Sequence, residues 1–195
     1  MQAETLLTLS ALVTRIEEKG RAQGAISIAD IRRLTGRRMA GALLFFPAMI
    51  VVSPLSLVPT LPTMVAIIVL IVAGQLLIGK GKIWLPRRLL GLSLSGDRLE
   101  KAMKFLKPAA SWIDKVARPR WGWLAQGIPA RFAAAVCIFV ALTMPPLEFF
   151  PGASTAAGVI IAVFGLALMT LDGLLMLAAL GLVATAMTLF TLFIA

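Results

Sequence analysis

The sequence predicts an all-α integral membrane protein, and three observations carry this prediction. The chain of 195 residues is 59% hydrophobic and only 14% charged, whereas soluble domains carry about 25% charged residues. Every Lys and Arg lies in one of two blocks, residues 15–38 and residues 80–131. The stretches 39–79 and 132–195 contain neither residue type and are broken by prolines. Because a helix satisfies its own backbone in lipid, we expect two proline-broken helical hairpins there.

These blocks divide the chain into four segments. We expect a cytoplasmic helix–loop–helix over residues 1–38 and a first membrane hairpin over residues 39–82. A basic amphipathic linker at the membrane interface should follow over residues 83–131. Residues 132–195 should form a second hairpin and a C-terminal transmembrane helix. Basic flanks favour the cytoplasm, so an even number of crossings between them predicts a multi-pass protein with a cytoplasmic N-terminus.

The first segment predicts two short helices. Apolar residues recur at helical spacing over residues 4–19, and Gly20 and Gly24 are expected to end that helix. Ser27 fits the N-cap of a second helix over residues 28–35. The sequence leaves open whether this pair mediates dimerisation or is a solvated cap.

The first apolar region predicts a helical hairpin with a proline-rich tip. As a helix, the run from Met39 to Ser53 would measure about 22 Å, against a hydrocarbon core of about 30 Å. Residues 63–79 are also short for a span. The hairpin therefore either crosses the membrane or re-enters and turns back within it. Three prolines of the tip cannot continue a regular helix: Pro54, Pro59 and Pro62.

The basic linker predicts an amphipathic helix from Asp97 onward. Leu99, Met103 and Leu106 share one helical face, and Pro108 is expected to end or kink the helix. Basic residues beside Trp suit a helix that lies in the membrane interface and binds anionic head groups. Packing on the protein's own cytoplasmic face would give the same pattern. The candidate head-group residues are Trp84, Arg87, Arg88, Lys101, Lys104, Lys107 and Trp112.

The second apolar region contains three runs. Residues 132–143 and 153–170 flank a second proline-rich tip. Asp172 and Gly173 then form a turn, which we expect at the membrane interface. The last run, residues 174–195, is long enough to span a membrane as a helix.

The two apolar regions also align with one another without gaps. The alignment pairs Pro54 with Pro146 and Pro59 with Pro151, and it fixes the offset at 92 residues. Paired, proline-broken apolar segments are typical of transporter sites. A duplicated structural hairpin would give the same pattern.

Few residues in this chain offer chemistry. The chain has no His and a single cysteine, Cys137, which removes the commonest general base and any multi-cysteine metal site. We therefore expect no enzyme, no metal and no cofactor. The candidate polar site in the membrane consists of Glu148, Ser56 and Gln75. An ionisable residue buried in a membrane is functional by default, but at the tip of a spanning hairpin Glu148 would face water.

A set of short motifs extends over the first hairpin, the linker and the last turn. The motifs are Gln75-Leu76-Leu77, Gly79-Lys80, Trp84-Leu85-Pro86-Arg87-Arg88, Leu106-Lys107-Pro108, Trp112-Ile113, Arg118-Pro119-Arg120 and Asp172-Gly173-Leu174. At these residues the chain resembles the ExoD family of exopolysaccharide synthesis proteins. The resemblance implies a bacterial inner-membrane protein linked to exopolysaccharide production, with the exopolysaccharide machinery as a partner. It brings no catalytic residues.

Three function classes follow from these observations. The leading one is a non-enzymatic multi-pass membrane protein that supports exopolysaccharide synthesis or export. The second is a small transporter or channel for protons, cations or a lipid-linked intermediate. The third is a membrane scaffold that assembles partners, with a homodimer left open. Membrane lipids with anionic head groups are expected partners. A nucleic-acid partner is not expected, because such proteins spread basic residues over a folded surface with few apolar runs.

Overall fold

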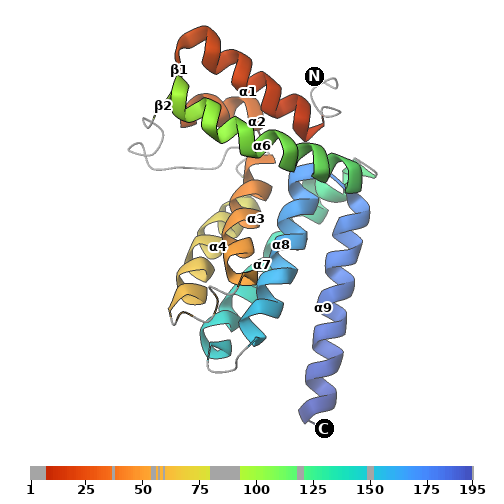
Figure 1. Ribbon diagram of the computed structural model, residues 1–195. Helices are drawn as coiled ribbons and strands as arrows, with labels where there is room; N and C mark the ends of the chain where they lie inside the picture. Colours follow the sequence, from red (N-terminus) through yellow and green to blue (C-terminus); the bar gives the residue numbers. More distant parts are fainter. Residues whose placement is uncertain are drawn as a thin grey trace.

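The computed structural model divides into a bundle of long apolar helices and a layer of shorter elements across one end of it (Figure 1). The structure describes residues 8–36, 38–53, 56, 58, 60–79, 93–117, 121–148 and 152–194. We call the layer the cap layer and the bundle end beneath it the cap end. The opposite end, where each hairpin turns, is the tip end.

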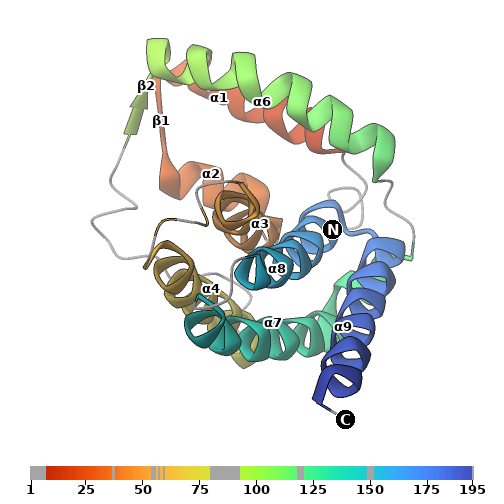
Figure 2. The same ribbon diagram turned by 60° about the horizontal axis from the view of Figure 1, so that its bottom comes forward.

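The bundle places the two hairpins against each other. Its described helices are α3 (Arg38–Val52), α4 (Leu61–Ile78), α7 (Gly127–Leu147), α8 (Ala153–Thr170) and α9 (Gly173–Ile194). The most extensive contacts join α3 to α8 and α4 to α7, so each hairpin packs mainly on the other (Figure 2). The terminal helix α9 packs on α8 at the cap end, and its residues 184–189 are all exposed.

Close backbone contact joins α3 to α8. A Cβ atom added to Gly41 would lie 2.3 Å from the backbone nitrogen of Met169. One added to Gly165 would lie 2.6 Å from the backbone nitrogen of Phe45. Only glycine allows this approach. In lipid, where apolar burial between helices gains little, such tight van der Waals packing becomes a main source of helix association.

Three described helices, α4, α7 and α8, are long and apolar enough to cross a membrane. A fourth span results if Ala29–Thr35 and Arg38–Val52 are counted as one helix bent by 111°. The described apolar part of α9, Gly173–Leu189, belongs to the shorter class, so its crossing stays a prediction. Large apolar side chains cover the outer surface of the bundle, as lipid contact requires; those more than half exposed include Met64, Ile67, Ile71, Phe139 and Leu142.

The helix α7 is longer than the apolar run from which it was predicted. It begins at Gly127 and continues through Pro145 and Pro146 to Leu147, whereas the run covers residues 132–143. Each proline removes one N–H donor from the last turn of the helix. The helix then ends at Glu148, whose N–H donates to the Met144 carbonyl at 3.2 Å.

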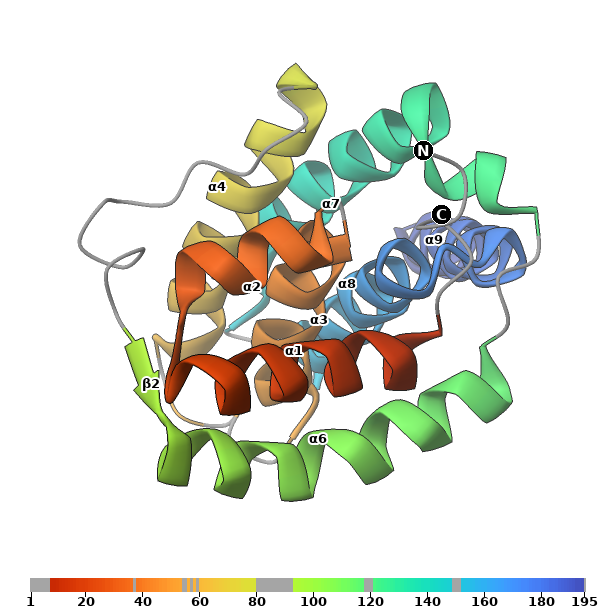
Figure 3. The ribbon, with the colours of Figure 1, turned by 90° about the horizontal axis from the view of Figure 1, so that it is seen from above.

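The cap layer is built from segments that are far apart in the sequence. It contains α1 (Leu9–Gln23), β1 (Ala25–Ser27), α2 (Ile28–Thr35), β2 (Ser93–Ser95) and α6 (Gly96–Val116). The helices α1 and α6 lie side by side above the bundle (Figure 3). The strands β1 and β2 pair antiparallel, with Ile26 opposite Leu94.

Two expected helix ends in the cap layer are not found. The first helix continues through Gly20 and ends only before Gly24, the second predicted end, which adopts a left-handed conformation with φ 70°. The helix α6 continues through Pro108 to Val116, so an end at this proline is wrong, whereas a kink there stays a prediction. In both cases the packing of α1 against α6 outweighs the local preference of glycine and proline. The pairing of β1 with β2 was not predicted.

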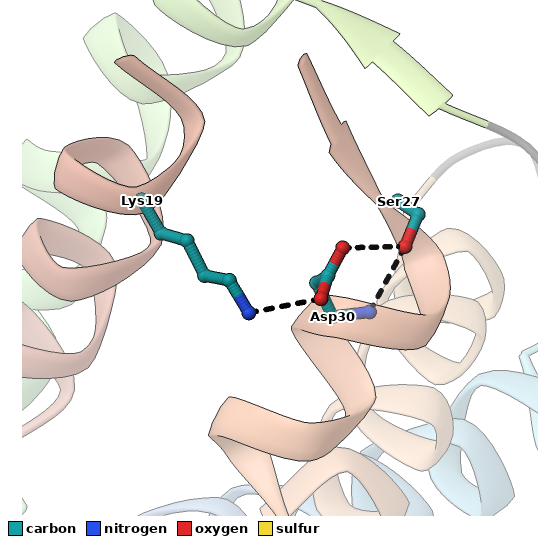
Figure 4. Close-up of polar contacts among 3 residues, drawn as sticks. All are labelled: Lys19, Ser27 and Asp30. Atoms are coloured by element: carbon teal, nitrogen blue, oxygen red, sulfur yellow. Dashed lines mark hydrogen bonds and ion pairs between the residues drawn. The ribbon is translucent and has the colours of Figure 1, made fainter. Parts of the chain in front are cut away.

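The predicted N-cap at Ser27 is confirmed. Its hydroxyl accepts a hydrogen bond from the Asp30 N–H at 3.1 Å and donates to the Asp30 carboxylate at 2.7 Å. The Lys19 ammonium of α1 reaches the other carboxylate oxygen at 2.9 Å (Figure 4). This cluster joins α1 to the first turn of α2.

Two further carboxylates join α1 to α6. Asp114 of α6 accepts hydrogen bonds from the backbone N–H groups of Leu9 and Ser10 at 2.9 and 2.8 Å, so it satisfies two free N–H groups at the start of α1, beyond the one that the N-cap Thr8 satisfies. Glu17 of α1 is buried and pairs with Lys107 of α6 at 2.5 Å. The hydrogen bond from Lys107 holds the pKa of Glu17 below its ordinary value.

Candidate polar site at the helix tips

Glu148 belongs to the second hairpin, but its side chain accepts hydrogen bonds from the first. It follows the last residue of α7 at the tip end, and its Oε1 atom accepts two hydrogen bonds from Thr63, from the backbone N–H at 2.7 Å and from the hydroxyl at 2.6 Å. Thr63 lies in the first turn of α4. The N-cap residue of α4, Thr60, makes no side-chain capping bond. The carboxylate of Glu148 therefore supplies the capping acceptor that α4 lacks.

The electrostatics of this contact favour the charged carboxylate. The N-terminus of a helix carries a partial positive charge, which stabilises an adjacent anion. The hydrogen bonds from Thr63 hold the pKa of Glu148 below its ordinary value, and they outweigh partial desolvation, which raises it. Glu148 is thus a carboxylate at neutral pH. This state suits a fixed capping group or a cation ligand better than a group that takes up and releases protons near neutrality.

A second polar contact joins the tip of the first hairpin to a helix start of the second. The Ser56 hydroxyl of the first tip lies 3.2 Å from the Thr155 hydroxyl, in the first turn of α8. The structure thus places Ser56 and Glu148 each on a helix start of the opposite hairpin. We call the two contacts together the tip clasp, formed by Ser56, Thr63, Glu148 and Thr155.

Gln75 lies at the other end of the bundle. It is in the last turns of α4, whereas Thr63 is in the first turn, about 18 Å away at 1.5 Å per residue. The residue is half-buried and takes part in an interaction with a partner. The three residues predicted as one membrane site therefore divide into Ser56 and Glu148 at the tip end and Gln75 at the cap end.

The tip prolines can be placed only in part. Pro62 is buried in the first turn of α4, where its missing N–H leaves no bond unmade. Pro146 is exposed in the last turn of α7. Pro54, Pro59 and Pro151 lie outside the described residues.

The predicted head-group residues also lie in several environments. Trp112 projects from α6 with 69% of its surface exposed, and Lys104 is exposed on the same helix. Lys107 is engaged with Glu17, so at least this cation serves packing within the cap layer. The structure does not describe Trp84, Arg87 and Arg88 or the side chain of Lys101.

The predicted turn at Asp172 and Gly173 begins the last helix. Asp172 is buried, and its Oδ1 atom accepts the Leu174 N–H at 2.9 Å, which caps α9. A Cβ atom on Gly173 would lie 2.8 Å from the carbonyl oxygen of Trp121, so only glycine fits there.

The sequence did not indicate that Thr63 is the partner of Glu148 or that Thr155 is the partner of Ser56. The one available signal is that both threonines stand in the first turn of a helix after a proline-rich tip. Among the described residues, no group of three His, Cys, Asp or Glu side chains is placed to hold a metal ion. Cys137 is buried within α7.

Comparison with known proteins adds one family match. The family model described as "Exopolysaccharide synthesis, ExoD" matches residues 9–192, which include the cap layer, both hairpins and nearly all of α9. No curated protein and no solved structure matches the chain.

Proposed function

Because the chain belongs to the ExoD family, which implies involvement in exopolysaccharide synthesis, we propose that it supports the synthesis or export of exopolysaccharide without being an enzyme. It does so as a multi-pass protein of the bacterial inner membrane. The family match and the three apolar helices of span length support this proposal.

One observation carries the non-enzymatic part of the proposal. Outside the two basic blocks the sequence contains only two acids between Met39 and Ala195, Glu148 and Asp172. Glu148 caps α4, and Asp172 caps α9. An enzyme needs acids, bases or nucleophiles aimed at a substrate. Here both carboxylates are directed at helix starts.

We further propose that the two hairpins are copies of one unit. The helices α4 and α8 both have 18 residues, and their first residues, Leu61 and Ala153, differ by the 92-residue offset of the alignment. The residues before them, Thr60 and Gly152, are both left-handed, with φ 72° and 86°. The residues after them, Gly79 and Leu171, are left-handed as well.

The contacts between the hairpins support the same proposal. In a two-fold arrangement, residue i of one unit contacts residue j of the other, and j contacts i in return. The offset relates Ser56 to Glu148 and Thr63 to Thr155, so the two contacts of the tip clasp are exchanged copies. Packing of α3 on α8 and of α4 on α7 follows the same exchange. Such an axis would run along the membrane normal, as for parallel repeats.

The tip clasp favours a transporter as the second candidate function. Two halves related by such an axis can rock against each other, and the clasp would close the tip end in the state described. Opening would require Glu148 to leave Thr63. The lowered pKa keeps the Glu148 carboxylate charged, which favours a cation over a proton as the coupled species.

The proposed orientation places the cap layer in the cytoplasm. Every Lys and Arg among the described residues belongs to the cap layer or to the first turns of α3 and α7 at the cap end, and the sequences of the tips contain neither residue type. The positive-inside rule then puts the tips on the periplasmic side.

A clean deletion in the bacterium of origin tests the function. We expect secreted polysaccharide to fall and to be restored by the wild-type chain. Complementation with Glu148→Gln and, separately, with Ser56→Ala asks whether either contact of the clasp contributes. Undiminished polysaccharide in the deletion would contradict the proposal. Solute flux in vesicles containing the purified protein would favour the transporter.

A further inference from the structure

Exposed aromatic side chains gather where α7 begins at the cap end. The short 3-10 helix η2 (Gly122–Ala125) precedes α7 and contacts both α7 and α9. Trp121 and Trp123 are 60% and 68% exposed there. Ile128 and Phe132 in the first turns of α7 are 80% and 58% exposed. Such a group of large apolar side chains indicates a contact surface.

The backbone holds the first of these side chains in a strained conformation. Trp121 has φ 50° and ψ 46°, in the left-handed region that bulky residues rarely adopt. Its carbonyl accepts the Leu124 N–H at 2.8 Å and lies against Gly173 at the start of α9. Strain of this kind persists when the surrounding structure fixes it, and it often marks a functional position.

The position along the bundle identifies the surface that these side chains meet. Gly127 is the first residue of α7, a helix of span length. The rings of Trp121 and Trp123 therefore stand beside the point where the apolar part of the chain begins. Trp is enriched at this level of a membrane, because its ring is apolar and its N–H requires a polar partner.

The charge around these rings identifies the lipid. Residues 115–131 contain four Lys or Arg and no Asp or Glu. Arg131 is exposed, with its guanidinium next to Gly79 at the end of α4. Ile128, three residues before it and four residues before Phe132, is a neighbour of both side chains on the helix surface. A cation fixed beside apolar side chains is complementary to an anionic lipid head group.

We propose that residues 121–132 form an interfacial anchor that inserts the rings of Trp121 and Trp123 into the head-group layer and binds anionic phospholipid. The anchor fixes the depth and tilt of α7 and, through Gly173, of α9. This assignment goes beyond the proposed function and does not depend on it.

Fluorescence of the full chain in vesicles tests the anchor. A variant with Trp84→Phe and Trp112→Phe keeps only Trp121 and Trp123 as emitters. We expect strong quenching by phosphatidylcholine brominated near the head group, weak quenching by lipid brominated near the chain ends, and weak quenching by aqueous acrylamide. If this variant does not elute as one species, the same signal is obtained as the difference between wild type and Trp121→Phe/Trp123→Phe.

The lipid charge is tested in the same vesicles. Brominated phosphatidylglycerol should quench about twice as strongly as the same fraction of brominated phosphatidylcholine, because the anionic lipid is enriched around the anchor. Arg131→Gln should remove most of this increase, whereas Arg15→Gln, the same charge change on α1, should leave it. Free access to acrylamide without bromolipid quenching would overturn the anchor in favour of water or a protein partner. Equal quenching by neutral and anionic bromolipids would overturn the preference for anionic lipid.

Discussion

Replacing Glu148 by alanine should destabilise the bundle by detaching the start of α4. The change removes an acceptor of two hydrogen bonds from Thr63, at 2.7 and 2.6 Å. Loss of an N-cap costs about 1 kcal/mol, and the second bond to a charged acceptor adds about 1 kcal/mol at a half-exposed site. We therefore expect Glu148→Ala to lower the free energy of unfolding by about 2 kcal/mol.

The measurement is equilibrium unfolding of the full chain in detergent micelles, followed by circular dichroism. Glu148→Gln keeps an oxygen acceptor without the charge and should lose about half as much, about 1 kcal/mol. Thr63→Val removes the hydroxyl donor but keeps the N–H, so its effect and that of Glu148→Ala should not add. Ser56→Ala breaks the neutral contact at 3.2 Å and should cost only about 0.5 kcal/mol.

Three results would refute this reasoning. One is an unfolding free energy unchanged in Glu148→Ala, and another is full additivity with Thr63→Val. The third concerns pH. Because the folded pKa of Glu148 is lowered, its contribution should be present above the ordinary glutamate pKa and be lost as the pH falls through the folded pKa. Stability that rises on acidification and requires Glu148 would contradict the clasp.

Two further predictions concern packing and the cap layer. Gly41→Ala forces a Cβ atom into the backbone of α8 and should lower the free energy of unfolding by about 3 kcal/mol in the same measurement. The control Gly74→Ala, with open space around it, should be neutral or stabilise by about 0.5 kcal/mol. Equal effects of the two substitutions would contradict the close packing of α3 on α8. In a carboxyl NMR titration, Glu17 should titrate below ordinary glutamates and move upward in Lys107→Gln but not in Lys104→Gln. Stability carried by Glu17 should then be lost as the pH falls below the ordinary glutamate pKa.

Hydropathy located two of the three helices of span length well, whereas α7 extends beyond its apolar run at both ends. The run 153–170 coincides with α8, and the run 63–79 differs from α4 by two residues at its start and one at its end. The reason is physical: charge-free apolar stretches have no stable place in water, and prolines and glycines mark where a helix can start or stop. Pro62 was assigned to the tip, but it fits within the first turn of α4.

Helix ends and strands in the cap layer could not be predicted from local sequence, because tertiary packing determines them. Gly20 was expected to end a helix and Pro108 to end or kink one, yet α1 and α6 continue through them because the two helices support each other along their length. The pairing of Ile26 with Leu94 joins two three-residue strands. Strands that short show no alternation long enough to recognise.

The sequence predicted Glu148 as a residue of the candidate site but not its partner. Glu148 stood out as one of only two acids in the apolar regions, but no pattern in a single sequence shows which helix start a side chain will meet. Its partner Thr63 lies 85 residues earlier in the chain. The exposure of Trp121 and Trp123 and the left-handed backbone at Trp121 are properties of the fold that a single sequence does not indicate.

The hydrogen bonds from the start of α1 to Asp114 impose an order of events during synthesis. Leu9 leaves the ribosome 105 residues before the carboxylate that satisfies its N–H group. By then the first hairpin is complete and available for insertion, since translation adds only about 5–20 residues per second. The start of α1 can therefore form these hydrogen bonds only after α6 has been synthesised and lies at the same end of the bundle as α1.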